Sequence, residues 1–250
     1  MKNAQTQDAF GLLLTHHFAG ESCNEFIERD DGYLVATDNL AAYFAPYSEW
    51  PPRFQRAMNY VRGRVLDVGV GAGRFALYLQ ELGHEVVGID VSPGALEVCR
   101  RRGVENVHRL PFHKIDASLG TFDTVLMMGN NFGLFANPGR AKWMLRRLKN
   151  LTSENARIVA ESLDIYGTDK PEHLSYHARN RDRGRMAGEI RLRVRYRELI
   201  GDWFDYLMVS QPEMREIVEG TGWRVAEFIG GAGGQYVGVI EKEGCSGGAR

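Results

Sequence analysis

The sequence predicts an α/β fold in which helices cover both faces of a mostly parallel sheet. From Arg64 onward, apolar segments of strand length alternate with segments of helical periodicity, and this alternation is typical of parallel sheets. At the first junction, the apolar segment 64–68 leads into a loop with glycines at 69, 71 and 73. Glycine has no Cβ, so this loop can turn tightly and let a ligand approach its backbone.

Length and composition fit one ordinary globular domain, residues 1–250. The chain has 250 residues and is 44% hydrophobic, which is enough to bury a sizeable core. Its net charge is −1. No apolar run approaches the roughly 18 residues of a membrane span, and the first residues lack the layout of a signal peptide. The cysteines Cys23, Cys99 and Cys245 are odd in number and far apart, which favours neither disulfides nor a metal site. We therefore expect a cytoplasmic protein with no membrane partner and no metal.

Residues 1–60 are predicted to form an N-terminal lid. Residues 10–18 have helical spacing of apolar groups, and Asp31-Gly32 lies between two apolar runs, which is a hairpin signal. Residues 41–50 are rich in aromatic side chains, and Pro51-Pro52 begins a helix that leads to Tyr60.

The core is predicted over residues 61–165. A helix over 74–82 follows the glycine loop, and the strand 85–90 precedes a helix capped by Ser92 with Pro93 in its first turn. The next elements are the strand 122–128, the basic amphipathic helix 140–150 and the strand 156–163.

After the core, the regular pattern breaks and a cap insertion is predicted over residues 166–210. Residues 166–188 are polar and are expected to be irregular, whereas 189–199 alternate as a half-buried strand with 203–209 as its antiparallel neighbour. Residues 211–243 are expected to complete the core with a helix and two strands, and 244–250 form a flexible tail.

The glycine loop has a spacing of its own. It reads Asp67-x-Gly69-x-Gly71-x-Gly73, and Asp90 closes the next strand, where a nucleotide ribose would offer its hydroxyls. A dinucleotide site has G-x-G-x-x-G instead. The chain therefore resembles the class I S-adenosylmethionine-dependent methyltransferases over about residues 60–162 and again over 235–241; Val70 departs from the family's usual small residue.

This resemblance implies a doubly wound, Rossmann-like sheet of seven strands with an antiparallel C-terminal strand. It implies S-adenosyl-L-methionine as cofactor and S-adenosyl-L-homocysteine as product. Asp67 and the loop 69–73 would hold the methionine end, Asp90 the ribose and Val91 one adenine face. The residues implied in cofactor binding are Asp67, Gly69, Val70, Gly71, Gly73, Asp90, Val91, Phe112, Met128 and Gly129.

The contact with the adenine amino group is left open. Many relatives have an acid after the third strand, where this chain has Leu110-Pro111-Phe112. Either Asp116 serves from a shortened loop, or backbone groups and Phe112 do. Asp116 as a simple helix cap is an equal alternative.

The acceptor side has several candidates and no assigned base. Asn130 and Asn131 would face the transferred methyl group or simply form a turn, and Tyr43 would close over the cofactor or pack in the core. His173, His177 and His113 are candidate bases, because histidine takes up protons near neutral pH; a solvated loop histidine is the alternative for each. The segment 130–132 differs from the (N/D)-P-P-(Y/F/W) element of amino-directed nucleic-acid methyltransferases.

An arginine-rich segment divides the function hypotheses. Arg193 and its neighbours on 189–199 would bind an anionic substrate, contact RNA phosphates, or form a solvated strand face. The near-zero net charge and the interleaved acids argue against nucleic acid.

We therefore predict methyl transfer to a small-molecule oxygen or nitrogen nucleophile. The alternatives are an RNA or protein methyltransferase that uses the arginine strand, or a non-catalytic cofactor-binding partner protein. The oligomeric state is left open.

Overall fold

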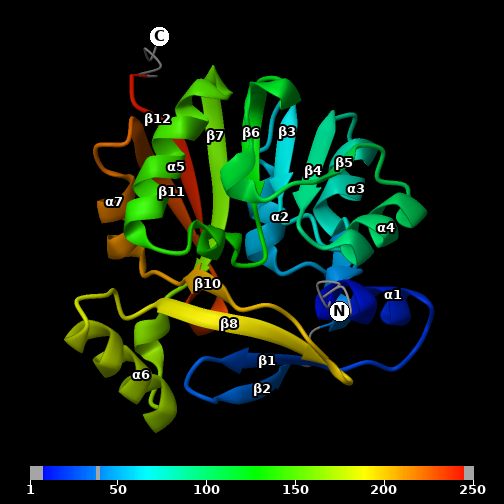
Figure 1. The fold of residues 1–250 in the computed structure, drawn as a ribbon. Helices are drawn as coiled ribbons and strands as arrows, with labels where there is room; N and C mark the ends of the chain where they lie inside the picture. Colours follow the sequence, from blue (N-terminus) through cyan, green and yellow to red (C-terminus); the bar gives the residue numbers. More distant parts are fainter. Residues whose placement is uncertain (1–7, 38–39, 245–250) are drawn as a thin grey trace, which may run out of the picture.

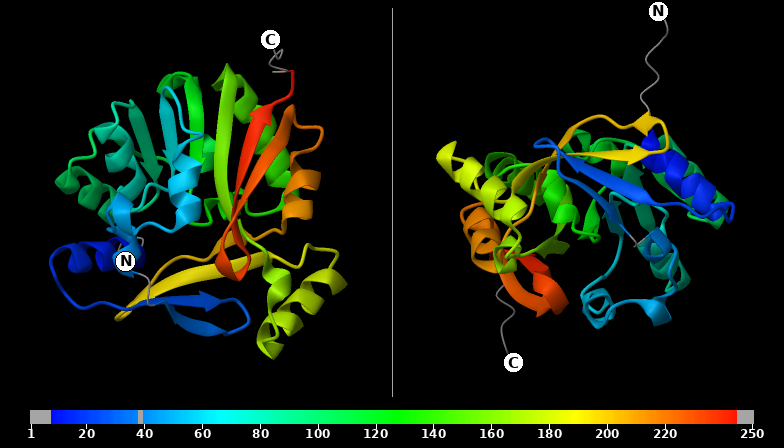
Figure 2. Two further views of the ribbon diagram at one scale, coloured as in Figure 1. Left: turned by 180° about the vertical axis from the view of Figure 1, so that it is seen from behind. Right: turned by 90° about the horizontal axis from the view of Figure 1, so that it is seen from below.

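The computed structural model describes residues 8–37 and 40–244. It consists of a seven-stranded main sheet with helices on both faces, and a smaller sheet that lies across the lower edge of the main sheet (Figure 1). Figure 2 shows the same arrangement from behind and from below. Among the described residues, no helix is long and apolar enough to cross a membrane.

The main sheet has the strand order β11-β12-β7-β6-β3-β4-β5. Pairing is parallel from β7 to β5, whereas β12 is antiparallel to both of its neighbours. The predicted mostly parallel sheet with one antiparallel C-terminal strand is therefore confirmed. Its strands are β3 (Val65–Val68), β4 (Val86–Asp90), β5 (Val107–Arg109), β6 (Phe122–Met127), β7 (Thr152–Leu163), β11 (Trp223–Gly230) and β12 (Gln235–Lys242).

Two hydrophobic clusters hold the helices to the two faces of this sheet. One contains α5 (Pro138–Asn150) and α7 (Gln211–Val218). The other contains α2 (Pro52–Met58), α3 (Arg74–Glu81) and α4 (Pro93–Arg102). Short 3-10 helices lie between these elements: Leu40–Tyr43, Tyr47–Glu49, Phe112–Lys114, Ala117–Leu119, Asn131–Phe135, Ile165–Gly167 and Ala232–Gly234.

The smaller sheet, here called the cap sheet, joins segments from two distant parts of the chain. Its order is β10-β8-β1-β2, and β9 pairs with β8. The predicted hairpin is β1 and β2, and β1 pairs antiparallel with β8. The predicted pairing of 189–199 with 203–209 is also present, as β8 with β10. The strands are β1 (Glu25–Arg29), β2 (Leu34–Thr37), β8 (Glu189–Tyr196), β9 (Leu199–Ile200) and β10 (Phe204–Leu207), and α1 (Ala9–Phe18) packs against α4.

The prediction of an irregular segment over 166–188 was wrong. The helix α6 (Pro171–Asp182) begins there with Pro171 in its first turn. Its buried side chains are Tyr176, His177 and Asn180, so its inner face is aromatic and polar. Apolar periodicity could not detect such a helix, because that pattern looks for aliphatic side chains.

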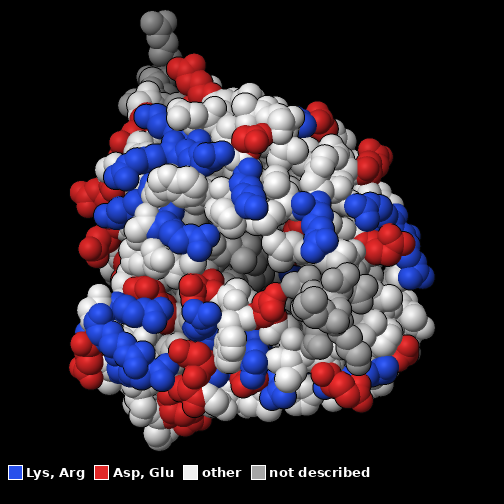
Figure 3. Space-filling model, in the orientation of Figure 1, with Lys and Arg blue, Asp and Glu red and all other residues white. Residues whose placement is uncertain are grey.

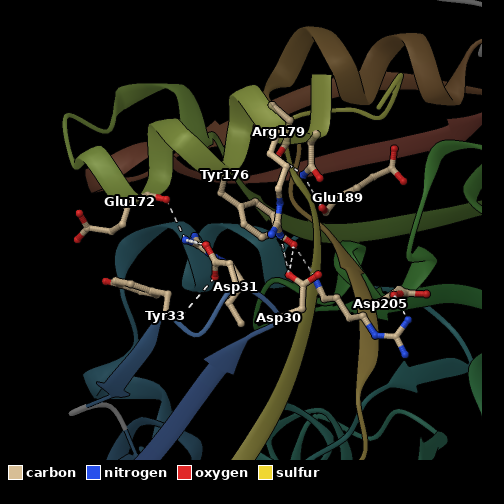
Figure 4. A network of polar contacts seen from close by, with 12 residues as sticks. Asp30, Asp31, Tyr33, Glu172, Tyr176, Arg179, Glu189 and Asp205 are labelled. Atoms are coloured by element: carbon tan, nitrogen blue, oxygen red, sulfur yellow. Dashed lines mark hydrogen bonds and ion pairs between the residues drawn. The ribbon is translucent and has the colours of Figure 1, made fainter. Parts of the chain in front are cut away.

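The helix α6 is held to the β1–β2 hairpin by polar and aromatic contacts (Figure 4). The Arg29 guanidinium lies 4.2 Å from the Tyr176 ring centroid and donates to the Glu172 carbonyl at 2.9 Å. The Tyr176 hydroxyl donates to Asp30 at 2.7 Å, and Arg179 forms an ion pair with the same carboxylate at 3.0 Å. These contacts fix the outer end of the cap sheet.

Candidate functional site

A large cavity lies between the carboxyl ends of the main-sheet strands and the inner face of the cap sheet. Its volume is about 1830 Å³, well above the roughly 300–1,000 Å³ of a site for one drug-sized ligand. The face drawn in Figure 3 is hollowed between the core and the cap. Predicted site residues that line it are Tyr43, Gly69, Val70, Gly71, Asp90, Val91, Phe112, His113, Met128, Gly129, Asn130, Asn131, His173 and His177.

The loop after β3 needs glycine for its conformation. Gly69 and Gly71 have φ values of 72° and 56°, in the left-handed region that residues with a Cβ disfavour. A Cβ on Gly69 would also lie 2.5 Å from Asn131 Nδ2. That amide nitrogen donates to the carbonyls of Val68 at 2.8 Å and Gly69 at 3.2 Å. Asn131 thus braces the glycine loop.

Gly73 does not line the cavity. A Cβ there would lie 2.6 Å from a methyl group of Val104 and 3.2 Å from the sulfur of Cys99. Gly73 is the N-cap residue of α3, and its φ is 79°. The positive φ and the close packing of the helix account for the third glycine of the motif, and its cofactor contact stays a prediction.

Asp90 ends β4 with its carboxylate held by two backbone amides. The amide of Gly71 donates to Oδ2 at 3.1 Å, and the amide of Ser92 donates to Oδ1 at 3.0 Å. Burial raises the pKa of this carboxyl, and the amide bonds oppose that shift. Both oxygens keep acceptor capacity, which fits a pair of ribose hydroxyls. The neighbouring Val91 is 59% exposed.

Asp67 is buried and does not line the cavity. Asp67 is 3% exposed, and its Oδ2 has no hydrogen-bond partner within the described part of the chain. Burial first and the charge of Asp90 second raise the pKa of this carboxyl to about 7, whereas Arg74 opposes the shift. A buried acceptor without a partner is costly. The unpartnered Oδ2 therefore favours a hydrogen-bond donor or a positive charge close to it.

The loop after β6 is held by an acid that sequence reasoning missed. Gly129 and Asn130 both have positive φ, and their amides donate to Glu161 Oε2 at 2.7 and 3.0 Å. Arg53 forms an ion pair with the other oxygen at 3.1 Å, with both side chains almost entirely buried. Burial raises the pKa of Glu161, and Arg53 opposes the shift. In the sequence, the one sign of this role was an acidic residue within the apolar segment 156–163.

Asn130 and Tyr206 meet at the edge of the cavity. The Tyr206 hydroxyl donates to the Asn130 carbonyl at 2.6 Å. This tyrosine was not among the predicted site residues. The side-chain oxygen of Asn130 is buried and has no partner among the described residues. It is available to a ligand that donates a hydrogen bond.

Of the two side chains considered for the adenine contact, Phe112 lines the cavity and Asp116 does not. Phe112 is 8% exposed and lines the cavity. Asp116 does not line it; its carboxylate accepts from the amide of Ser118 at 2.9 Å and caps a turn. His113 lines the cavity, and its pKa is lowered by burial and by Arg140.

The candidate bases of the cap face the same cavity. His173 Nδ1 is 3.1 Å from the Thr168 hydroxyl, and His177 is buried on α6. Burial is the largest cause that lowers the pKa of both histidines. Both rings are therefore neutral at pH 7 and able to accept a proton. Tyr43 lies near Gly71, and burial raises its pKa.

Arg193 does not line the cavity, and its position agrees with the alternative of a solvated strand face. The inner face of β8 carries Ile190, Leu192 and Val194, and successive strand residues point to opposite faces. Arg193 instead forms two hydrogen bonds with Glu28, at 2.8 and 2.9 Å.

A carboxylate at the end of β4 and a glycine loop at the end of β3, facing one cavity, define a Rossmann-like nucleoside-binding enzyme. Comparison with known proteins agrees. A family model described as a methyltransferase domain matches residues 65–155. A crystal structure of an S-adenosylmethionine-dependent methyltransferase from Bacteroides fragilis, in complex with S-adenosyl-L-homocysteine, is 26% identical. That match covers 95% of each chain with a TM-score of 0.80.

Two curated relatives match over shorter segments. A 23S rRNA (uracil(747)-C(5))-methyltransferase from Pyrococcus abyssi is 30% identical over 109 residues, which are 42% of this chain and 27% of that protein. A 2-heptyl-1-hydroxyquinolin-4(1H)-one methyltransferase from Mycobacteroides abscessus is 45% identical over 51 residues, 19% of this chain and 22% of that protein. The chain spans about half or less of the length of the curated relatives it matches. The family model and the structural match support a class I S-adenosylmethionine-dependent methyltransferase, with S-adenosyl-L-methionine as its cofactor.

Proposed function

We propose that this protein transfers a methyl group to an oxygen or nitrogen nucleophile of a small molecule bound beneath the cap sheet. The observation that carries the proposal is the shared cavity. The cofactor loops after β3, β4 and β6 line one side of it, and apolar side chains of the cap sheet line the other. A cavity of this size between the core and the cap suits two small ligands better than a nucleic-acid strand.

In this proposal the cofactor lies along the carboxyl ends of β3, β4 and β6. Asp90 accepts from the ribose hydroxyls, and Val91 with Phe112 covers the adenine. The backbone of Gly69 and Gly71 holds the methionine end, with Met128 and Gly129 contributing from the neighbouring loop. When bound, S-adenosylmethionine supplies a methyl group that is already activated on a sulfonium centre.

The chain then has to position the nucleophile and accept its proton where one is lost. Much of the rate of such a transfer comes from positioning alone. Asn130 Oδ1, buried and without a partner among the described residues, supports a role in orienting an N–H or O–H group. His173 and His177 are neutral and line the cavity, which supports either as the proton acceptor.

The rival function is methylation of RNA or protein with the arginine strand as platform. Its arginines are already paired with acids: Arg193 and Arg195 with Glu28, and Arg191 with Asp205. Blue and red side chains are accordingly interleaved over the cap in Figure 3. Neutralised arginines attract phosphates weakly, which supports the small-molecule proposal.

A methyl-transfer assay tests the proposal directly. Purified protein with isotopically labelled S-adenosylmethionine is offered a panel of amines, phenols, alcohols and carboxylic acids, and in parallel total RNA and unfolded protein. We expect label in one or more small molecules. Label confined to RNA or protein would refute the proposal. Binding of S-adenosyl-L-homocysteine without transfer to any acceptor would favour the non-catalytic alternative.

A further inference from the structure

A buried carboxylate on the cap sheet faces the cavity and was not among the predicted site residues. Glu25 is the first residue of β1, is 5% exposed and lines the cavity. The hydroxyl of Thr37, its partner across the β1–β2 ladder, donates to Glu25 Oε2 at 2.6 Å. This bond fixes the carboxylate and leaves the Oε1 oxygen available to a ligand.

No cation of the described chain neutralises Glu25. Within residues 8–37 and 40–244, its carboxylate forms no ion pair, and its recorded side-chain contact is the one with Thr37. Burial raises the pKa of this carboxyl, the Thr37 bond opposes the shift, and no positive charge contributes. Burial of an unpaired carboxylate is expensive. Two other buried acids of this cavity do have partners. Glu161 forms an ion pair with Arg53, and Asp90 accepts hydrogen bonds from two backbone amides.

Glu25 lies on the side of the cap that faces the cofactor loops. Burial raises the pKa of Tyr43, and the charge of Glu25 adds to that shift. The Tyr43 ring is in turn 3.7 Å from the position that a Cβ on Gly71 would take. The carboxylate therefore lies close to the part of the cavity assigned above to the cofactor.

Beside this carboxylate the cap sheet is aliphatic. Ile27 follows Glu25 by two residues on the same face of β1, and it pairs with Val35 on β2 and Val194 on β8. All three side chains line the cavity. An acceptor with its polar atom at Glu25 would rest its remaining atoms on this aliphatic row.

We propose that the acceptor is a small molecule with a basic amine on an apolar body, and that the amine binds the Glu25 carboxylate. This inference rests on the proposed function and selects nitrogen over oxygen. A charge-assisted hydrogen bond from the ammonium to Oε1 supplies the positive partner that the chain itself does not provide. The same oxygen is placed to take one ammonium proton, which leaves the carboxyl neutral and the nitrogen with a free electron pair.

The test uses three probes of equal chain length: n-octylamine, n-octanol and octanoate. Calorimetry measures their binding to the protein loaded with S-adenosyl-L-homocysteine, at concentrations below micelle formation. We expect n-octylamine to bind about 10-fold or more tightly than the other two, the effect of one charge-assisted hydrogen bond. Glu25→Gln should remove this preference. Glu28→Gln, on the outer face of the same strand, should retain it.

Equal or weaker binding of n-octylamine by the unaltered protein would overturn the inference, as would an amine preference that survives in Glu25→Gln. If Glu25→Gln no longer binds S-adenosyl-L-homocysteine, Glu25→Ala serves as the second variant, and an amine preference that survives there would count against the inference. An amine preference without methyl transfer to any acceptor would refute the proposed function while the binding role of Glu25 stands.

Discussion

The two walls of the cavity are built by different means. The floor consists of the loops after β3, β4 and β6, whose backbone is fixed by positive φ angles and by the buried acids Asp90 and Glu161. The roof is the inner face of the cap sheet, where the strands present mainly aliphatic side chains and the Glu25 carboxylate, whereas the ion pair of Arg193 with Glu28 lies on the outer face. The polar groups of the floor are therefore buried, whereas those on the outer side of the roof are partly exposed to solvent.

This difference suggests a division of work. The floor binds an invariant cofactor, so its polar groups are buried and mutually dependent. In the proposed function the roof selects the acceptor, and apolar side chains on a regular strand can vary one at a time. Substitutions should therefore be costly in the floor and mild on the outer surface of the roof, and four variants test this contrast.

The largest effect is expected for Glu161→Ala in the floor. The substitution leaves Arg53 buried without a counter-charge and removes the acceptor of two loop amides. We expect a loss of roughly 3–5 kcal/mol in the free energy of unfolding, measured by urea denaturation. The control is Glu241→Ala on the same sheet, which removes a partly exposed carboxylate paired with Arg157 and Arg224 and should cost about 1 kcal/mol or less. Similar losses in both variants would contradict the contrast.

The second effect depends on pH and concerns Asp67. Its pKa of about 7 in the folded protein lies above the roughly 3.9 of an unfolded chain. Between these values the folded state holds the proton more tightly, so the carboxyl destabilises the protein progressively as pH rises. Relative to the unaltered protein, cofactor-free Asp67→Asn should gain roughly 4 kcal/mol in unfolding free energy between pH 4 and pH 8. A pH-independent difference between the two proteins would show that the burial effect is absent.

The third effect is on cofactor affinity. Asp90→Ala removes the carboxylate assigned to the ribose and releases the amides of Gly71 and Ser92. Calorimetry with S-adenosyl-L-homocysteine should show a loss of roughly 1–3 kcal/mol in binding free energy. Asp116→Ala, outside the cavity, should bind as the unaltered protein does. An unchanged affinity in Asp90→Ala would remove the ribose assignment.

The smallest effect is expected for Arg193→Ala on the outer side of the roof. Its partner Glu28 is also contacted by Arg195 at 3.3 Å, and the pair is partly solvated. The unfolding free energy should fall by about 1 kcal/mol or less, and the affinity for S-adenosyl-L-homocysteine should not change. A marked loss of affinity would mean that the outer face of β8 acts on the cofactor site.

The sequence by itself determined the loops after β3 and β4 in the floor, and the order of the main-sheet elements along the chain. The glycine loop, the Ser92 cap and Asp90 are set by residues within a few positions of one another, because φ preference, capping and periodicity are local properties. The same local pattern could not distinguish Gly73, which permits helix packing, from Gly69 and Gly71, which shape the cavity.

The tertiary structure alone decided the roof and the charge network. Glu25, Arg53, Glu161 and Tyr206 come from four distant segments, and β1 meets β8 across more than half of the chain. Strand register then decided that Arg193 faces solvent while Leu192 and Val194 face the cavity. Such pairings are selected by the packing of whole elements, because neighbours in sequence fix the alternation of a strand but not the surface that either face will meet.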